Sequence, residues 1–279
     1  METKKIWLVT GASKGLGLAI VKQLLQKGYR VAATSRNRNA LVNAVAYKDS
    51  EFFPIEMDLV NEKSVESGVK AIVQHFGTID VVVNNAGYGQ AGTLEELSDT
   101  ESRKNFDVNV FGVLNVIRSV LPHLRANKRG HIFNISSVAG FIGNFPSFGI
   151  YCATKYAVVG LTEALAAETK SFGITASVVY PGYFRTNFLD EGSFGLPNTP
   201  IDVYTEARKI EQLHVNEIRG NQTGDPNKAA AVLLEIALLE NPPLHLFLGS
   251  DAYQYAQQKI TSVENDLSTY KEIATATDY

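Results

Sequence analysis

Short runs of apolar residues alternate along this chain with longer segments in which apolar residues recur at helical spacing. Some short runs, such as Val81–Val83 and Ser177–Val179, are largely apolar at consecutive positions, which is typical of strands buried on both faces. Strands that alternate with helices predict a parallel sheet with helical crossovers. We therefore expect an α/β fold with a doubly wound parallel sheet, flanked by helices on both faces, that binds ligands beyond the carboxyl ends of its strands.

The alternation places the individual elements along the chain. The predicted strands are Ile6–Thr10, Arg30–Ser35, Phe52–Ile55, Ile79–Asn84, His131–Ser136, Thr175–Tyr180 and Leu244–Leu248. The main predicted helices are Leu16–Lys27, Ser64–His75, Ser102–Ala126, Tyr151–Phe172 and Asn227–Leu239. We expect a single domain over residues 1–279, with a substrate-binding lid inserted at about 183–225 and a helical extension at about 250–279. The lid contains a polar helical stretch near Asp202–Arg219.

The composition excludes several classes of function. With 45% apolar and 20% charged residues, the 279-residue chain resembles a globular domain with a full core. A net charge of −3 gives no basic surface for nucleic acid, and no uncharged stretch is long enough for a membrane span. A single cysteine, and a run at Ile6–Val9 too short for a signal peptide, predict a cytoplasmic protein. The five histidines lack metal-ligand spacing, so we expect no metal.

A glycine-rich turn follows the first predicted strand and reads Thr10-Gly11-Ala12-Ser13-Lys14-Gly15-Leu16-Gly17. Glycines at this spacing let the backbone turn sharply and approach a pyrophosphate, while the following helix offers unpaired N–H groups and a positive dipole. No Gly-Lys-Ser/Thr closes the turn, so it is not a Walker P-loop. The motif predicts a dinucleotide site, and the alternative is a glycine-rich turn without a ligand.

The end of the second predicted strand distinguishes NAD from NADP. Proteins of this fold that bind NAD place a carboxylate there, which accepts from the ribose 2′-hydroxyl and would repel a 2′-phosphate. Here the strand ends at Ser35 and Arg36 follows, while Lys14 lies in the glycine-rich turn. A guanidinium and an ammonium suit a phosphate dianion. We therefore predict NADP(H), the alternative being that both cations are solvated loop residues.

Two further segments follow predicted strands at the same sheet edge. Asp58-Leu59 comes after the third strand, where the carboxylate could accept from an adenine amino group or cap the next helix. Asn84-Asn85-Ala86-Gly87 ends the fourth strand. Its small residues would let a cofactor lie against the backbone, and its asparagine side chains could hold neighbouring strands together.

Tyr151 and Lys155 lie one turn apart and so share a face of their predicted helix. A tyrosine hydroxyl, with a usual pKa of about 10, exchanges protons poorly near neutrality, and a nearby ammonium would lower that pKa. Taken alone, a tyrosine and a lysine one turn apart favour a structural role over a catalytic one. However, the preceding strand leads into Ser136-Ser137, whose hydroxyl could hold a substrate oxygen beside the tyrosine. Cys152 points about 100° away and is interpreted as a packing residue.

These motifs, in this order and spacing, resemble those of a classical short-chain dehydrogenase/reductase with a Rossmann fold, over essentially the whole chain. The matching pieces are Thr10-Gly11-x-x-x-Gly15-x-Gly17, Asn84-Asn85-Ala86-Gly87, Asn109, Ser137, Tyr151-x-x-x-Lys155 and Pro181-Gly182. Lys14 and Arg36 match the NADP-preferring pattern of that family. The run from Tyr151 to Lys155 and the C-terminal extension resemble its hydroxysteroid and retinol dehydrogenase-like branch.

The resemblance implies a role for each catalytic residue. Tyr151 would be the general acid in reduction and the general base in oxidation, Lys155 would also hold the nicotinamide ribose, and Ser137 would orient the substrate. Asn109 would interrupt its helix and hold a water that links Lys155 to solvent. The cofactor-binding residues, predicted above or implied by the resemblance, are Gly11, Ser13, Lys14, Gly15, Leu16, Gly17, Arg36, Asp58, Leu59, Asn85, Ala86, Gly87, Tyr151, Lys155, Pro181, Gly182, Phe184 and Thr186.

Large apolar side chains gather in the two segments expected to frame a substrate, one after Ser137 and one in the lid. They are Phe141, Phe145, Phe148, Tyr183, Phe184, Phe188, Phe194 and Leu196. We predict that Ser137, Phe145, Tyr183 and Phe188 contact the substrate, which would be an apolar or aromatic ketone, aldehyde or alcohol. The alternative is that several of these rings only pack the lid.

The predicted activity is NADP(H)-dependent reduction of a ketone or aldehyde, or the reverse reaction, with the proton exchanged by Tyr151. Rival hypotheses are an NAD-linked secondary-alcohol dehydrogenase and a non-catalytic NADP(H)-sensing protein. A sugar-nucleotide epimerase or dehydratase is a third, which the glycine spacing and the chain length disfavour. The resemblance also implies a homo-oligomer, a dimer or tetramer, in which the C-terminal extension could block one interface.

Overall fold

The computed structural model describes residues 4–47 and 50–279. Within these residues the main sheet has seven parallel strands in the order β3-β2-β1-β4-β6-β7-β9. The strands are β1 (Ile6–Val9), β2 (Arg30–Ser35), β3 (Phe52–Glu56), β4 (Val81–Asn84), β6 (Gly130–Ile135), β7 (Ile174–Pro181) and β9 (His245–Leu248). This order confirms the predicted doubly wound sheet, and each of the seven predicted strands is present with shifts of at most about two residues.

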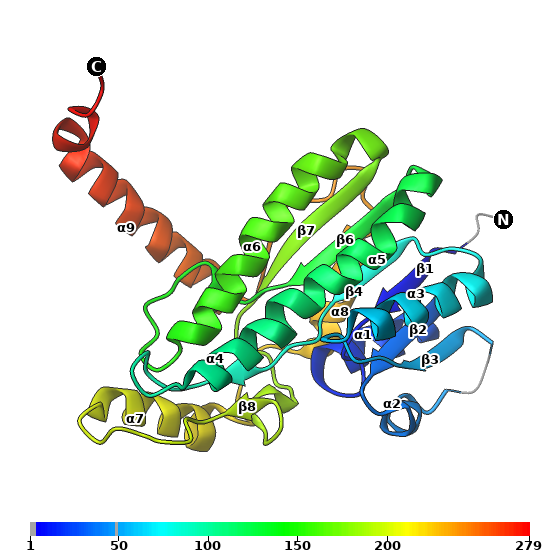
Figure 1. Cartoon of the computed structure of the whole chain (residues 1–279), viewed down its shortest axis with the longest axis horizontal. Helices are drawn as coiled ribbons and strands as arrows, with labels where there is room; N and C mark the ends of the chain where they lie inside the picture. Colours follow the sequence, from blue (N-terminus) through cyan, green and yellow to red (C-terminus); the bar gives the residue numbers. More distant parts are fainter. Residues whose placement is uncertain (1–3, 48–49) are drawn as a thin grey trace.

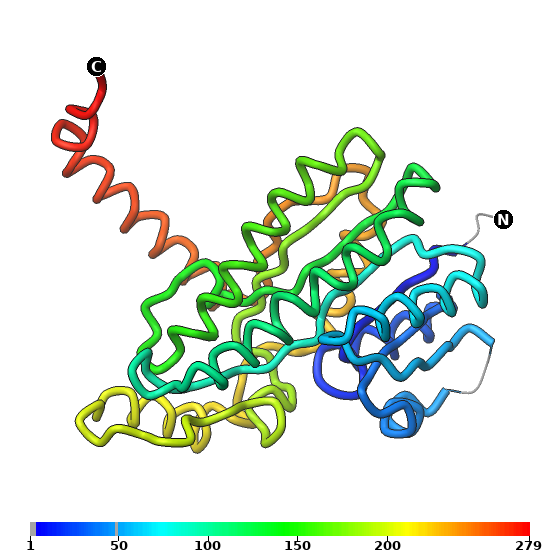
Figure 2. The backbone as a smooth tube through the Cα atoms, viewed as in Figure 1, coloured from blue at the N-terminus to red at the C-terminus, as the bar shows by residue number. Residues whose placement is uncertain are grey.

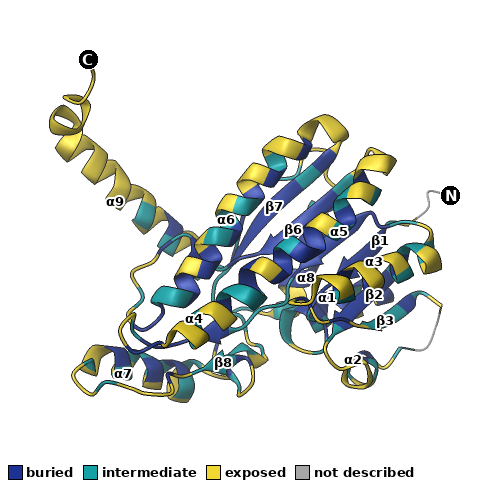
Figure 3. Ribbon diagram, in the orientation of Figure 1, coloured by how far each residue is buried: buried dark blue, intermediate teal, exposed yellow. Residues whose placement is uncertain are grey.

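Helices cover both faces of the sheet (Figure 1). They are α1 (Gly15–Gln26), α2 (Arg38–Val45), α3 (Glu62–Phe76), α4 (Asp99–Phe106), α5 (Gly112–Asn127), α6 (Gly149–Thr169), α7 (Thr205–Gln212), α8 (Pro226–Ile236) and α9 (Ser250–Thr275). On one face Val9 of β1 packs with Leu24 of α1 and Leu233 of α8. On the other face Leu8 packs with Val116 of α5. Successive residues of β1 therefore enter opposite cores, which is why this strand is apolar throughout. The strands of the main sheet are largely buried between the helices (Figure 3).

The predicted helix Ser102–Ala126 differs from the structure in two respects. It begins earlier, at Asp99, because Ser98 and Glu101 form a capping box that satisfies backbone donors at both positions. A π-helical turn (Asp107–Phe111) then separates α4 from α5. The interruption at Asn109 that the family resemblance implied is therefore present, as one turn of wider helix.

Several other elements differ from the sequence prediction. The helix α2 was not predicted, and neither was a small parallel pair formed by β5 (Gly89–Gln90) and β8 (Phe194–Gly195). The predicted helix Tyr151–Phe172 ends at Thr169 and continues as a short 3₁₀ turn. In the lid, α7 covers only part of the polar stretch near Asp202–Arg219 and is followed by a second π-helical turn, Leu213–Ile218.

The last helix, α9, leaves the body of the molecule and extends away from it (Figure 2). Ala252 and Ala256, in its first two turns, are buried, whereas most later residues are exposed (Figure 3). No helix in the described part of the chain has the length and apolar character of a membrane span.

Candidate active site

The glycine-rich turn brings the ends of β1 and β4 into backbone contact. Gly11 and Gly15 have φ angles of 64° and 60°, in the left-handed region that favours glycine. A Cβ atom on Gly11 would lie 2.7 Å from the Cα of Ala86, and one on Gly17 would lie 2.8 Å from the carbonyl oxygen of Gly11. Side chains are therefore excluded at these positions, and the floor of the site is bare backbone.

The N-terminus of α1 lacks a capping side chain. Lys14 occupies the N-cap position without a capping hydrogen bond, whereas Asn61 caps α3. The first-turn N–H groups of α1 are therefore available to an anion. A Cβ on Gly15 would lie 3.6 Å from the Cβ of Thr186, so a lid hydroxyl borders the same turn. Ser13 and Leu16, predicted in this turn, are partly buried in it. The chemistry of this corner fits a pyrophosphate.

Asn85 fixes the carboxyl edge of the sheet. Its Nδ2 donates to the carbonyl oxygens of Thr10 at 3.0 Å and Gly11 at 3.1 Å. The hydroxyl of Thr10 accepts from the backbone N–H groups of Asn85 and Ala86. On the other side of β4, Asn84 donates to Asn134 of β6 at 2.8 Å. The two asparagines hold neighbouring strand ends together, as the sequence suggested, and leave Ala86 and Gly87 open along the edge.

Arg36 and Lys14 are exposed at the end of β2 and in the glycine-rich turn. The backbone N–H of Ala12 donates to the carbonyl of Thr34 at 3.0 Å, which places the turn beside the end of β2. Neither cation forms an ion pair with any described residue. This corner therefore carries positive charge that the described protein residues leave uncompensated.

Asp58 and Leu59 lie at the end of β3, but they differ in what they present. The Asp58 carboxylate is exposed and accepts from the N–H of Val60 at 3.1 Å, while Asn61 is the residue that caps α3. Leu59 is buried in the core, and its carbonyl accepts from Asn115 at 2.8 Å. Asp58 thus keeps an oxygen available, whereas Leu59 can reach a ligand only through its backbone.

Tyr151, Lys155 and Ser137 converge at the end of β6. Tyr151 and Lys155 are both buried on α6, and the Lys155 Nζ lies 5.8 Å from the centre of the Tyr151 ring. The Lys155 Nζ donates to the carbonyl oxygen of Ile135 at 3.0 Å. Ser137 is the second residue after this strand, and its side chain is within hydrogen-bonding reach of the Tyr151 hydroxyl. A hydroxyl pair and an ammonium therefore meet at one point of the sheet edge.

Burial dominates the protonation of both titratable groups. It raises the pKa of the Tyr151 hydroxyl above its usual value, and the hydrogen bond from Ser137 only partly opposes this shift. Burial also lowers the pKa of Lys155 to about 8. In the protein alone, burial therefore outweighs the lowering of the Tyr151 pKa that the sequence led us to expect from the Lys155 ammonium. A further positive charge beside the pair would be needed to reverse the direction.

Asn109 connects the π-helical turn to the site. Its Nδ2 donates to the Tyr88 carbonyl at 3.0 Å and to the Thr154 hydroxyl at 3.1 Å, and its Oδ1 accepts from the Tyr88 N–H at 3.0 Å. A Cβ on Gly87 would lie 3.0 Å from this Oδ1 and 3.5 Å from the Lys155 Nζ. Both amide protons of Asn109 are used within the protein, so any water it holds would contact an oxygen of this residue.

Aromatic rings border Tyr151 on the lid side. Phe188 lies 5.9 Å from the Tyr151 ring and Phe148 lies 6.4 Å from it, measured between ring centres. Phe145 packs against this group and against Tyr255 at the base of α9. Three other side chains predicted to frame the substrate lie away from Tyr151. Phe141 packs on β7 and β9, Phe184 packs against the α1–α8 core, and the Leu196 side chain is exposed.

Tyr183 and the segment Pro181-Gly182 are held by two residues that sequence reasoning missed. The Tyr183 hydroxyl donates to the Nε2 of His214 at 3.0 Å, because the His214 Nδ1 is occupied by the carbonyl of Ile210 at 2.7 Å. The Tyr183 backbone N–H donates to the Asp251 carboxylate at 2.6 Å. His214 lies in a π-helical turn and Asp251 in the first turn of α9, so neither belongs to a local motif that a reader of the sequence could use.

Comparison with known proteins gives the family. The family model described as short chain dehydrogenase matches residues 5–193, well over half of the chain. The chain belongs to the short-chain dehydrogenase family. Oxidoreductase BOA17 of Botryotinia fuckeliana is 35% identical over 98% of each chain. The 3-ketodihydrosphingosine reductase of Bacteroides thetaiotaomicron is 34% identical over 88% of each chain.

Solved structures extend the comparison to three dimensions. A short-chain dehydrogenase from Streptomyces avermitilis has a TM-score of 0.91 at 35% identity and covers 100% of both chains. ElxO with NADP bound has a TM-score of 0.74 at 26% identity, covering 90% of this chain and 99% of its own. The likeness to the Streptomyces protein extends past residue 193, where the family model ends, to the rest of the lid and to α9.

The lid of this dehydrogenase is anchored by a buried ionic network. Arg208 of α7 donates to both carboxylate oxygens of Glu96, at 2.6 and 2.8 Å, and pairs with Glu211 at 2.9 Å. The Glu96 side chain is fully buried and also accepts from the N–H groups of Thr93 and Ile201. Ser147, whose φ of 69° is unusual for a residue other than glycine, donates to Glu211. These residues join the lid to loops beside the catalytic edge.

The network also sets the protonation of its two acids. Burial alone would raise the pKa of Glu96, but hydrogen bonds from Ile201 and Thr93 together with the Arg208 charge hold it below its usual value. Burial raises the pKa of Glu211. Among residues 4–47 and 50–279, no three or more His, Cys, Asp or Glu side chains gather in a group that could hold a metal ion.

Proposed function

We propose that this short-chain dehydrogenase is an NADP(H)-dependent carbonyl reductase, or an alcohol dehydrogenase in the reverse direction, acting on an apolar or aromatic substrate. The observation that carries the proposal is the convergence of Ser137, Tyr151 and Lys155 beside the bare glycine turn. Three protein groups that can orient an oxygen, exchange its proton and stabilise its charge lie where a dinucleotide would end.

The residues around the turn fit the cofactor. The uncapped N-terminus of α1 and the hydroxyl of Thr186 would hold the pyrophosphate, and Arg36 with Lys14 would hold a 2′-phosphate. Gly87 leaves open the space beside Asn109 and Lys155, where a ribose would lie. When bound, NADPH supplies the hydride and NADP⁺ accepts it.

The chain's own residues carry the proton. In reduction the Tyr151 hydroxyl donates its proton to the carbonyl oxygen, while the Ser137 hydroxyl orients that oxygen and stabilises the charge that develops on it. Lys155 holds positive charge near the phenolate that remains and so favours proton release. The Asn109 side chain fixes Tyr88 and Thr154 around the lysine, as a positioning residue.

Replacing Tyr151 by Phe tests the reaction. We expect turnover to fall by at least about a hundredfold, because the proton donor is removed, while NADPH affinity measured by fluorescence or calorimetry stays unchanged. Tyr156→Phe is the matched control, since its hydroxyl lies on the same helix but contacts the Phe141 carbonyl outside the site. Near-normal turnover of Tyr151→Phe would refute the mechanism. NADPH binding without turnover of any carbonyl in a panel graded by size would favour a sensing protein.

Arg36→Ala tests the cofactor. We expect the KM for NADPH to rise about tenfold or more, while the KM for NADH changes little, because only NADPH carries the 2′-phosphate. The control is Arg38→Ala, because Arg38 is also exposed but binds the Pro54 carbonyl instead. Equal use of NADH by the unmodified enzyme would instead support the NAD-linked alcohol dehydrogenase.

The substrate class follows from the rings beside Tyr151. Phe188, Phe148 and Phe145 form an apolar wall beside Tyr151, and the lid over 183–225 would cover the space next to it. We therefore propose that the substrate carries its carbonyl on an apolar or aromatic group. The reductase of Bacteroides thetaiotaomicron, named for a 3-keto lipid base, is in keeping with such a substrate. We further propose a cytoplasmic location, in line with the free thiol of Cys152. We also propose a homo-oligomer, as the resemblance to the family implies.

A further inference from the structure

An apolar stripe runs along the exposed part of α9. Ile260, Val263, Leu267 and Tyr270 have exposed fractions of 40%, 40%, 69% and 57%, and none of them packs in a core cluster of the described residues. Their spacing of three, four and three residues places them on one face of the helix. A spacing that alternates between three and four is the seam pattern of a coiled coil.

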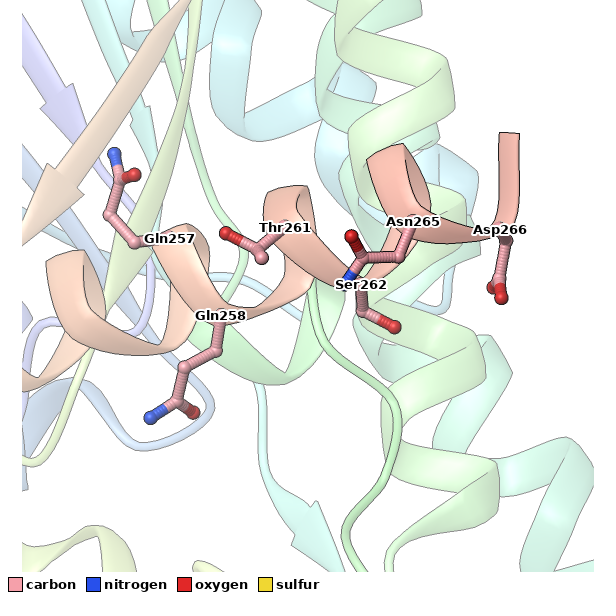
Figure 4. Close-up of a pocket in the computed structure, with 6 residues that line it drawn as sticks. All are labelled: Gln257, Gln258, Thr261, Ser262, Asn265 and Asp266. Atoms are coloured by element: carbon pink, nitrogen blue, oxygen red, sulfur yellow. The ribbon is translucent and has the colours of Figure 1, made fainter. Parts of the chain in front are cut away.

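Between Gln257 and Asp266, the face of α9 away from the stripe is polar. Figure 4 shows six side chains of this helix around a shallow hollow: Gln257, Gln258, Thr261, Ser262, Asn265 and Asp266. None of the four stripe residues is among them. This part of α9 is therefore amphipathic, but its apolar face packs against no core cluster of the described residues.

The charged residues beside the stripe favour one partner for it, a second α9 helix in parallel. With Ile260 and Leu267 at position a and Val263 and Tyr270 at position d, Lys259 and Asp266 fall at g, and Glu264 and Lys271 fall at e. In a parallel pair of helices, each g residue faces the e residue five positions later in the other helix. Lys259 then meets Glu264 and Asp266 meets Lys271, so every such contact joins opposite charges.

The alternative occupants fit less well. With the same core layers aligned in an antiparallel pair, Glu264 would face Glu264 and Asp266 would face Asp266 of the other copy. An anionic membrane surface would be repelled, because residues 250–279 carry five acidic side chains against two lysines. None of the four flanking charges has an ion-pair partner among the described residues.

We propose that α9 is a dimerisation helix that pairs in parallel with α9 of a second copy of this chain, through the stripe Ile260–Val263–Leu267–Tyr270. The first turn is already fixed to the body, by Ala252 in a core cluster and by Asp251 on the Tyr183 backbone. The helix is therefore formed and oriented before pairing, which lowers the entropic cost of a contact only two heptads long. This inference is independent of the reaction proposed above.

The first test measures the mass of the full-length protein by sedimentation velocity over a range of concentrations. We expect Leu267→Glu to weaken self-association at least about tenfold, whether or not the bodies also associate through another surface. Asn265→Glu is the matched control, because it adds the same charge to the polar face of the same helix. Identical masses for the unmodified protein and Leu267→Glu at every concentration would overturn the proposal, as would concentration-independent mass combined with binding to neutral phosphatidylcholine vesicles.

Charge reversal provides a second test. Because the second pair of substitutions should restore association, misfolding of a variant cannot imitate the expected result. Lys259→Glu combined with Asp266→Lys should weaken association, and adding Glu264→Lys with Lys271→Glu should restore it. Failure of the fourfold variant to recover would contradict the assigned pairing.

Tyr270→Cys tests the orientation. In a parallel pair the two cysteines face each other and should form an intermolecular disulfide on mild oxidation. The unmodified protein, whose Cys152 is buried, should not. Association without such a disulfide would overturn the parallel arrangement.

Discussion

The catalytic floor and the lid of this dehydrogenase are held in place by different kinds of interaction. On the floor, strand ends are joined by backbone and amide hydrogen bonds, such as those from Asn85 to Thr10 and Gly11. The lid is joined to the body by charged side chains, above all Arg208, which pairs with Glu96, and Glu211, which accepts from Ser147. The floor is therefore an extension of the sheet, whereas the lid is held by a few charged side chains together with the short β5–β8 pair.

Because of this difference, the placement of the reacting groups and the stability of the lid depend on different residues. A floor built from backbone holds the reacting groups in fixed positions, as catalysis by positioning and electrostatics demands. A lid held by an ionic network can be lost through one side chain without disturbing the sheet, because removing one partner leaves the others buried without compensation. Variants on either side should therefore have separable effects on chemistry, cofactor binding and lid stability.

The largest effect on lid stability is expected for Arg208→Leu. Loss of the guanidinium leaves the fully buried Glu96 carboxylate without its counter-ion, which should destabilise the lid by about 3–5 kcal/mol. Amide hydrogen exchange in α7 should accelerate and the KM for carbonyl substrate should rise, while NADPH affinity is retained. Lys209→Leu is the control, because its ion pair with Glu206 is exposed on both sides and contributes at most about 0.5 kcal/mol. Equal exchange rates in the two variants would show that the network does not anchor the lid.

On the floor, replacing Lys155 is expected to stabilise the protein, by less than the loss of Arg208 destabilises the lid. Because burial lowers the pKa of Lys155 to about 8, the unfolded chain binds this proton more tightly, and stability should rise with pH between about 8 and 10. Lys155→Met should abolish turnover yet raise the free energy of unfolding at pH 7 by about 1–3 kcal/mol, a gain that shrinks toward pH 10. Denaturant unfolding at several pH values measures it, with the exposed Lys170→Met as control. A loss of stability at pH 7 would show that the ammonium is compensated in the folded protein.

The smallest effect is expected at Tyr183, where the lid begins. Tyr183→Phe removes the hydroxyl that donates to His214 and should cost about 0.5–1.5 kcal/mol, seen as a modest rise in the KM for carbonyl substrate with kcat nearly unchanged. The control Tyr204→Phe removes an exposed lid hydroxyl that binds Glu95 and should leave both constants unchanged. A large fall in kcat for Tyr183→Phe would instead place this tyrosine in the chemical step.

The same contrast explains what the sequence could predict. The floor residues lie in short contiguous motifs at strand ends, and the strands were recognisable because a sheet covered on both faces needs apolar residues at successive positions. The lid anchor joins Glu96 to Arg208 and Ser147 to Glu211, pairs separated by 112 and 64 residues, and no local pattern relates such positions.

Short or weakly apolar elements escaped prediction for a related reason. In α2 only Leu41 and Val45 are buried, which is too little to give a helical period, and the pair of β5 with β8 has two residues in each strand. No break in an apolar pattern marks the π-helical turn at Asn109, because the one buried residue of α4 is the polar Asn105. The position of this turn came from the family resemblance and not from hydrophobic periodicity.

Asp251 has a practical consequence for shortening this protein. Its carboxylate fills the space where Gly182 and Gly249 would carry a Cβ, and it holds the backbone of Tyr183 against the catalytic edge. A chain trimmed after Ala256 would keep this brace and lose only the projecting arm. One trimmed at Gly249, where the last strand has just ended, would release the backbone beside the predicted cofactor site, so we expect the shortest active form to include the first two turns of the C-terminal helix.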